Sequence, residues 1–281
     1  MNADNEPQPA PAPEPEPGPE PEPQVEYILV ALDLSPHSEA ALASAAELAA
    51  ALHLELRGLY VEDVNLLRLC GLPFAVEFGS FTARPRRIEQ SHLEREFRMQ
   101  ATQLRKIMAD VAGRQRIAWS FQVVRGGVTD QLLEASAAAR MVSLGRVGRS
   151  PGKRTGSTAQ AVAARTQRPV VFQSRRQRSV SGPLVLVYTG SEAAGRALAL
   201  ALQLAAQEQT ALTVLAYADL DLTVLGEAAQ ESAAEVQVIH ATGLPALPDL
   251  LAELAGKGAV ILPVDAAGWL DAIPLTVIVT P

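Results

Sequence analysis

The chain has 281 residues, of which 48% are hydrophobic and 20% charged, which is ordinary for a globular protein with room for two domains. One cysteine, Cys70, excludes an internal disulfide, and four scattered histidines lack metal-ligand spacing, so we expect no metal site and a cytoplasmic setting. There is no apolar run of about 18 residues and no secretory signal pattern, so we expect no membrane association.

Residues 1–24 form a Pro/Glu-rich tail, with proline at nearly every second position from Pro7 to Pro23. This composition cannot bury apolar surface, so we expect a disordered, extended arm. It serves either as a solubilising spacer or as a docking segment for a partner. The tail has six acids and no Lys or Arg, which leaves 25 acidic and 24 basic residues in the rest of the chain. A near-neutral body gives no reason to expect nucleic-acid binding.

Residues 25–174 alternate apolar strand patterns with helix patterns, which predicts a doubly wound parallel sheet. The expected strands are Tyr27–Asp33, Leu54–Val61, Ile117–Arg125, Met141–Leu144 and Pro169–Gln173. The expected helices run from Ser35 to about Leu52, from about Arg87 to Ala112 with Gly113 as the stop, over Val128–Ala139 and over 157–167. Residues 64–86 are expected to be irregular, with Cys70 buried among apolar neighbours.

Residues 175–182 read as a basic linker, and residues 183–281 repeat the same element order in a shorter form. The expected strands of this second, truncated α/β domain are Leu184–Tyr188, Ala211–Ala218, Val236–His240, Ala259–Val264 and Leu275–Val279. Its expected helices are Ser191–Gln207 and Leu247–Ala255. Only Asp265–Pro274 stands between its last two strands, and no acid follows its first strand.

A glycine-rich loop follows the fourth strand of the first copy and opens a helix near Ser157. Its glycines allow the backbone to approach an anion, and the helix N-terminus adds free N–H groups and a positive dipole end. Four cations add charge: Arg146, Arg149, Lys153 and Arg154. The pattern predicts a polyphosphate site, although the spacing is not that of a P-loop.

With its motif Gly145-x2-Gly148-x7-Gly156-Ser157, the segment 26–173 resembles a universal stress protein domain, whose nucleotide-binding branch carries a loop two residues longer. The resemblance implies a Rossmann-like fold with strand order 3-2-1-4-5 and pairing through the last strand. It also implies an adenine-nucleotide site in the first domain. The implied nucleotide-binding residues are Asp33 and Val61 at the adenine, Gly145 and Gly148 near ribose and phosphate, and Gly156, Ser157 and Thr158 at the phosphates.

Three functions remain open. The first is a stress-response regulatory protein that binds ATP, ADP or AMP, with the part of Mg undetermined. The second is an interaction or dimerisation scaffold without nucleotide, in which Asp33 only caps its turn with Ser35 and the loop is a plain connection. The third is a slow ATPase or nucleotidyl transferase, although no catalytic base or nucleophile stands beside the loop. The expected partners are the nucleotide, the second copy or another subunit, and an unidentified protein.

Overall fold

The computed structural model describes residues 26–70, 72, 76–78, 85–87, 89–146, 155–173, 182–217, 220, 223–241, 250–251, 253 and 258–281. The tail and residues 147–154 of the glycine loop lie outside this description, as does most of the expected linker and of the helix expected at Leu247–Ala255.

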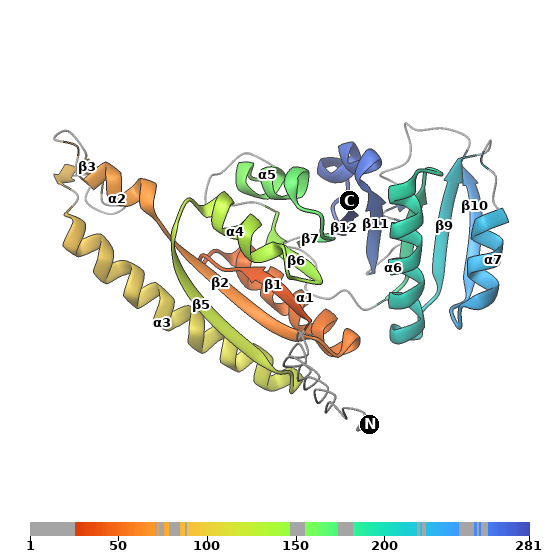
Figure 1. Ribbon diagram of the computed structural model, residues 1–281, viewed down its shortest axis with the longest axis horizontal. Coiled ribbons are helices and arrows are strands. Elements are labelled where there is room, and N and C mark those ends of the chain that lie inside the picture. Colours follow the sequence, from red (N-terminus) through yellow and green to blue (C-terminus); the bar gives the residue numbers. More distant parts are fainter. Residues whose placement is uncertain are drawn as a thin grey trace, which may run out of the picture.

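One sheet of ten strands runs through the whole molecule (Figure 1). Its strands are β1 (Tyr27–Ala31), β2 (Glu55–Asp63), β5 (Trp119–Gly126), β6 (Met141–Gly145), β7 (Val170–Gln173), β8 (Leu184–Tyr188), β9 (Leu212–Tyr217), β10 (Val236–Ala241), β11 (Ala259–Pro263) and β12 (Thr276–Thr280). Their order is β10-β9-β8-β11-β12-β7-β6-β1-β2-β5. Neighbouring strands are parallel except at the central pair β12 and β7, which is antiparallel.

The central antiparallel pair divides the sheet into two halves with the same topology. In each half the strands follow the order 3-2-1-4-5, and the fifth strands pair with each other. The expected order, the pairing through the last strand and the α/β class are therefore confirmed. That each half, 25–174 and 183–281, folds as a separate domain stays a prediction.

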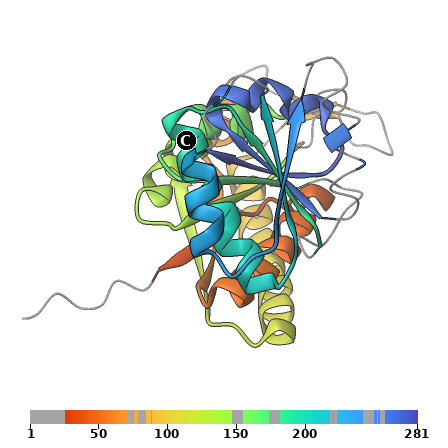
Figure 2. The same ribbon diagram turned by 90° about the vertical axis from the view of Figure 1, so that its right-hand side faces the viewer.

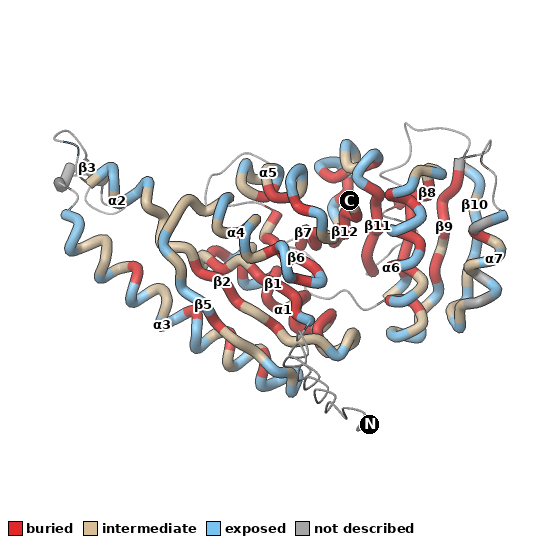
Figure 3. The backbone as a smooth tube through the Cα atoms, in the orientation of Figure 1, coloured by how far each residue is buried: buried red, intermediate tan, exposed pale blue. Residues whose placement is uncertain are grey.

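Helices cover both faces of the twisted sheet (Figure 2). One face carries α1 (Pro36–Leu52), α3 (Gln90–Gln115), α6 (Glu192–Glu208) and α7 (Thr223–Glu231). The other carries α4 (Val128–Ser136), α5 (Ser157–Arg165) and the 3-10 helix η1 (Val264–Ala272). Both faces bury an apolar layer, which is why the strands are nearly continuous apolar runs (Figure 3).

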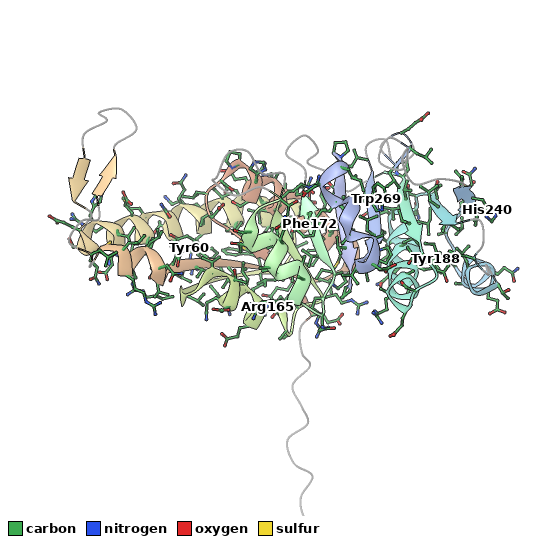
Figure 4. The ribbon with its side chains drawn as sticks, turned by 90° about the horizontal axis from the view of Figure 1, so that it is seen from above. Tyr60, Arg165, Phe172, Tyr188, His240 and Trp269 are labelled. Carbon is green, nitrogen blue, oxygen red and sulfur yellow. The ribbon has the colours of Figure 1, made fainter. Side chains whose placement is uncertain are left out.

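The junction between the halves is fully apolar at its centre. Val171 faces Ile278 across the β7–β12 ladder, and both are completely buried, as is the adjacent Phe172 (Figure 4). At the end of the ladder the Thr276 hydroxyl donates to the Gln173 side-chain oxygen at 3.0 Å. An apolar fifth strand that would otherwise be an exposed edge is thus covered in both halves.

A second contact between the halves comes from Arg140, just before β6. Its guanidinium donates to the Gln203 side chain on α6 at 3.4 Å and lies 4.0 Å from the Glu26 carboxylate. Arg140 thus contributes to the packing of α6 against the first half.

The segment 64–86, expected to be irregular, contains a helix and a hairpin. These are α2 (Val64–Cys70), and β3 (Val76–Phe78) paired with β4 (Pro85–Arg87). No residue of α2 is buried, so the apolar run that suggested burial of Cys70 instead lies on the surface. Cys70 is half-exposed, and its thiol donates to the Leu66 carbonyl at 3.3 Å.

Three other expectations were wrong in detail. Helix α3 continues through Gly113 and ends only at the left-handed cap Arg116, because Gly113 is exposed and a helical glycine costs about 1 kcal/mol, too little to end a long helix. Helix α7 was not expected. Residues 264–272, expected as a connection, form η1 in place of a full helix. None of the described helices is long and apolar enough to span a membrane.

Gly58 on β2 provides a test of packing under α3. A methyl group there would lie 2.3 Å from the Met108 sulfur and 3.0 Å from the Phe121 ring, both buried. We expect Gly58→Ala to lower the free energy of unfolding by about 1–3 kcal/mol through overpacking, measured by urea denaturation. Gly113→Ala, which meets open space in the same layer, should instead raise it by about 0.5–1 kcal/mol. If Gly58→Ala changed the free energy of unfolding no less favourably than Gly113→Ala, the side chains packed between β2 and α3 would have to accommodate the added methyl group without strain.

Candidate functional site

The turn after β1 is held by hydrogen bonds within the chain. The Asp33 carboxylate accepts from the Ser35 N–H at 3.0 Å, and the Ser35 hydroxyl caps α1 by accepting from the Ser38 N–H at 3.1 Å. Leu34 between them is left-handed, with φ 59°. Asp33 therefore fulfils the turn-capping role expected of it as the alternative to an adenine contact.

The end of β6 packs directly against the start of α1. A Cβ on Gly145 would lie 2.9 Å from the Cβ of His37 and 3.0 Å from its carbonyl carbon, so only glycine fits without displacing the backbone. Because β1 and β6 are parallel neighbours, Asp33 and Gly145 leave the same edge of the sheet. Val61 lies partly buried in the last part of β2, the parallel neighbour of β1 on its other side, and so near the same edge.

This edge is the topological switch point of the first half. The chain leaves β1 toward α1 on one face and leaves β6 toward α5 on the other. Ligands of open α/β sheets bind in the crevice that such a divergence opens beyond the carboxyl ends of the strands. The described members of the predicted site, Asp33, Val61 and Gly145, thus share one edge.

The N-terminus of α5 lies at the same edge, brought there by the ends of the glycine loop. The Gly156 N–H donates to the Arg146 carbonyl at 2.8 Å, which closes the loop at its base. Gly156 is the N-cap, and among the described residues no side chain caps the helix. Ser157 and Thr158 form its first turn, exposed and half-exposed respectively. Gly148, Arg149, Lys153 and Arg154 lie outside the described residues.

Arg146, expected as a phosphate-binding cation, serves another role. Its guanidinium is buried and donates to the carbonyls of Ile273 and Leu275, the latter at 2.6 Å, in the segment that joins η1 to β12. Thr155, at the other end of the loop, donates to the Asp271 carboxylate at 2.5 Å. Both ends of the loop are therefore anchored to the second half.

A cavity of about 340 Å³ lies beside these anchors, between α5 and η1. Thr155 and Gln160 contribute to one wall, and Gly268 and Asp271 to the other. The second half thus lines the flank of the helix whose N-terminus faces the switch point.

The role of Arg146 can be tested by stability. Arg146→Leu should lower the free energy of unfolding by about 2–4 kcal/mol, because it removes charged hydrogen bonds of about 1.5–3 kcal/mol each and leaves two carbonyls unpaired. Urea denaturation measures the loss of unfolding free energy. As the control, Arg165→Leu, at an exposed arginine of α5, should cost less than about 0.5 kcal/mol. A variant as stable as the wild type would contradict the anchoring role.

The second half has a similar turn but a different chemistry at its own switch point. Gly190 is left-handed with φ 78°, as Leu34 is, and the Ser191 hydroxyl caps α6 by accepting from the Ala194 N–H at 3.0 Å. Thr189 stands where the first half has Asp33. The Ser191 hydroxyl also donates to the Asp265 carboxylate at 2.9 Å. A carboxylate at this edge, with η1 in place of an α5 equivalent, repels a phosphate rather than binding it.

Metal chemistry has no visible ligand set in the part of the chain that the structure describes. No group of three or more His, Cys, Asp or Glu side chains gathers there in a way that could hold a metal ion. This finding does not bear on the described helix terminus, which offers N–H groups for an anion.

Comparison with known proteins places the chain in a family. It aligns over 92% of its length with 98% of a universal stress protein from Archaeoglobus fulgidus DSM 4304, at TM-score 0.71 and 18% identity. A functionally unknown protein from Pseudomonas aeruginosa PAO1 aligns over 91% of this chain and 92% of its own, at TM-score 0.54 and 12% identity. A putative universal stress protein from P. aeruginosa UCBPP-PA14 aligns over 91% of this chain and 93% of its own, at TM-score 0.54 and 13% identity. A search of curated proteins gave no match. Residues 25–172 match the sequence model of the Universal stress protein family, and the chain therefore belongs to that family.

Proposed function

We propose that this protein is a stress-response regulator that binds an adenine nucleotide at the switch point of its first half. The supporting observation is the N-terminus of α5, which has no capping side chain in the part of the protein that the structure describes. The hydrogen bond from the Gly156 N–H to the Arg146 carbonyl holds this terminus at the sheet edge where β1 and β6 end. Backbone N–H groups and the positive end of a helix dipole at such a place favour a phosphate.

In the proposed complex, different residues of the site contact the phosphates and the adenine of the nucleotide. The phosphates lie on the first turn of α5, at Ser157 and Thr158. The adenine lies toward Val61 and the side chain of Asp33, whose carboxylate also accepts from the Ser35 N–H. Gly145 lies between these two regions. The glycine loop is proposed to add contacts from Gly148, Arg149, Lys153 and Arg154, and this part of the proposal rests on the sequence of the loop.

A scaffold without nucleotide is the second candidate, because Asp33 and Arg146 both make contacts within the chain. In this alternative the continuous sheet and its covered centre would be the functional feature, since they present a rigid surface of two joined halves. No group in the described part of the site suggests an enzyme, and we propose neither a reaction nor a catalytic residue.

Titration calorimetry of the full chain with ATP, ADP and AMP decides between the two candidates. The proposal expects binding in the micromolar range at best, with one site per chain because the second half has η1 where the first half has α5. No heat with any of the three nucleotides at millimolar concentration would contradict it and would favour the scaffold. A stoichiometry of two would contradict the assignment of the site to the first half.

A further inference from the structure

The solvent face of α3 is strongly basic. Between Gln90 and Arg116 one acid, Asp110, is fully exposed, together with six cations, namely Arg95, Arg98, Arg105, Lys106, Arg114 and Arg116. Two further acids are partly exposed and already have cationic neighbours: Glu94 lies 3.7 Å from Arg125 and Glu96 3.2 Å from His92. We call these six cations the α3 basic face. Arg95, Arg98 and Lys106, at spacings of three and eight, line one side of the helix. Such a concentration of one charge attracts an anionic segment.

A shallow hollow of about 370 Å³ interrupts this face. It is lined by Arg98, Met99, Thr102, Gln103 and Lys106. Met99 is 65% exposed, the highest value among the exposed large apolar side chains of the described residues. Within the described part of the chain, no carboxylate lies within ion-pair distance of Arg98 or Lys106. The hollow therefore offers an apolar floor between two cations, which suits a ligand that alternates small apolar rings with carboxylates.

The chain itself contains such a segment in residues 1–24, where prolines alternate with six acids and no cation occurs. The described chain starts beside the basic face, because Glu26 lines a hollow together with Gln115 and Arg116 at the end of α3. In a polyproline II helix, Glu14 to Glu22 span about 25 Å at 3.1 Å per residue. Arg95 to Arg114 span about 28 Å at 1.5 Å per residue of α-helix. Length and charge therefore match when the tail runs back along α3.

We propose that residues 1–24 dock in cis on the α3 basic face, with prolines against Met99 and carboxylates at Arg98 and Lys106. The inference does not depend on the nucleotide site, which lies at the sheet edge beside α5. A docked tail covers the basic face until salt or a competing polyanion displaces it, because exposed ion pairs are individually weak and screened by salt. Tethering supports the contact by keeping the segment at a high local concentration.

Zero-length carbodiimide cross-linking tests this proposal, because the chain has only three lysines: Lys106, Lys153 and Lys257. Mass spectrometry of the full chain should locate amide links between Lys106 and tail glutamates, chiefly Glu14, Glu16, Glu20 and Glu22. We expect the yield to fall about threefold or more in the double variant Arg95→Gln and Arg98→Gln, and similarly at high salt. Arg165→Gln serves as the control, since Arg165 lies on α5 across the sheet (Figure 4).

Three outcomes would overturn the proposal. Tail links to Lys153 or Lys257 without links to Lys106 would place the tail elsewhere. In a mixture of isotopically labelled and unlabelled protein, links that join labelled to unlabelled chains would show docking between copies instead of within one. A yield at Lys106 that is unchanged in the double variant would likewise exclude the basic face as the docking surface.

Discussion

Replacing Gly156 with valine should weaken adenine-nucleotide binding about a hundredfold. Gly156 is the N-cap of α5, and its backbone lies where the proposed phosphates approach. A branched side chain there would hold a phosphate away from the first N–H groups of the helix. Contacts to charged groups contribute roughly 1.5–3 kcal/mol each, so the loss of two weakens binding by two or more powers of ten. Calorimetry with AMP, ADP and ATP measures the loss of affinity. In the wild type, the shorter glycine loop should favour AMP or ADP over ATP.

The matched control is Gly195→Val, at a position on α6 where a side chain meets open space. It should leave the affinity unchanged while making the same chemical change. Binding that survives Gly156→Val would place the nucleotide elsewhere in the protein.

A second pair of variants separates the two roles of Asp33. Asp33→Asn keeps an oxygen that can accept from the Ser35 N–H and so preserves the turn, whereas Asp33→Ala removes the turn contact as well. If the carboxylate contacts adenine, both variants weaken binding and only Asp33→Ala also lowers the melting temperature. If Asp33 only caps the turn, Asp33→Asn binds as the wild type does.

Ending the chain after Gln173 should convert the protein into a self-associating species. The truncation removes β12 and leaves β7 as an open edge, with Val170, Val171 and Phe172 no longer covered. An apolar edge strand with free N–H and C=O groups pairs with other copies. Arg146 would also lose the carbonyls of Ile273 and Leu275. Size-exclusion chromatography with light scattering should show the truncated chain in larger assemblies, relative to its chain mass, than the full chain forms under the same conditions.

Ile278→Asp tests the same junction in the full-length chain. Ile278 is completely buried opposite Val171, so a carboxylate there should lower the free energy of unfolding by about 3 kcal/mol or more. Val238→Asp, on a partly exposed valine of the outer strand β10, should cost much less.

A chain truncated after Gln173 that remains monomeric and as stable as the full chain would show that the halves do not depend on each other.

Much of the architecture was determined by local sequence. Continuous apolar runs such as Tyr27–Ala31 and Leu184–Tyr188 indicate strands buried on both faces, because a strand with one solvated face would alternate. Ser35 and Ser191 mark helix starts because a hydroxyl one position before a helix satisfies an N–H that would otherwise lack a partner. Three of the residues predicted for the site, Asp33, Val61 and Gly145, lie at or near strand ends, and their part in binding stays a prediction.

The roles of single side chains were decided by the tertiary structure. Arg146 lies in a cationic glycine loop, yet its guanidinium binds carbonyls about 130 residues further along the chain, a distance over which local pattern carries no information. Cys70 sits in an apolar run that stays near the surface, because α2 has no buried residue and only Leu67 among its described residues packs, partly buried, against a core. In both cases the neighbouring sequence suggests one environment, a phosphate site for Arg146 and a buried core for Cys70, and the side chain lies in another. Which of two such environments a side chain occupies depends on the packing of segments that are remote in sequence, and the ten-stranded sheet supplies that packing.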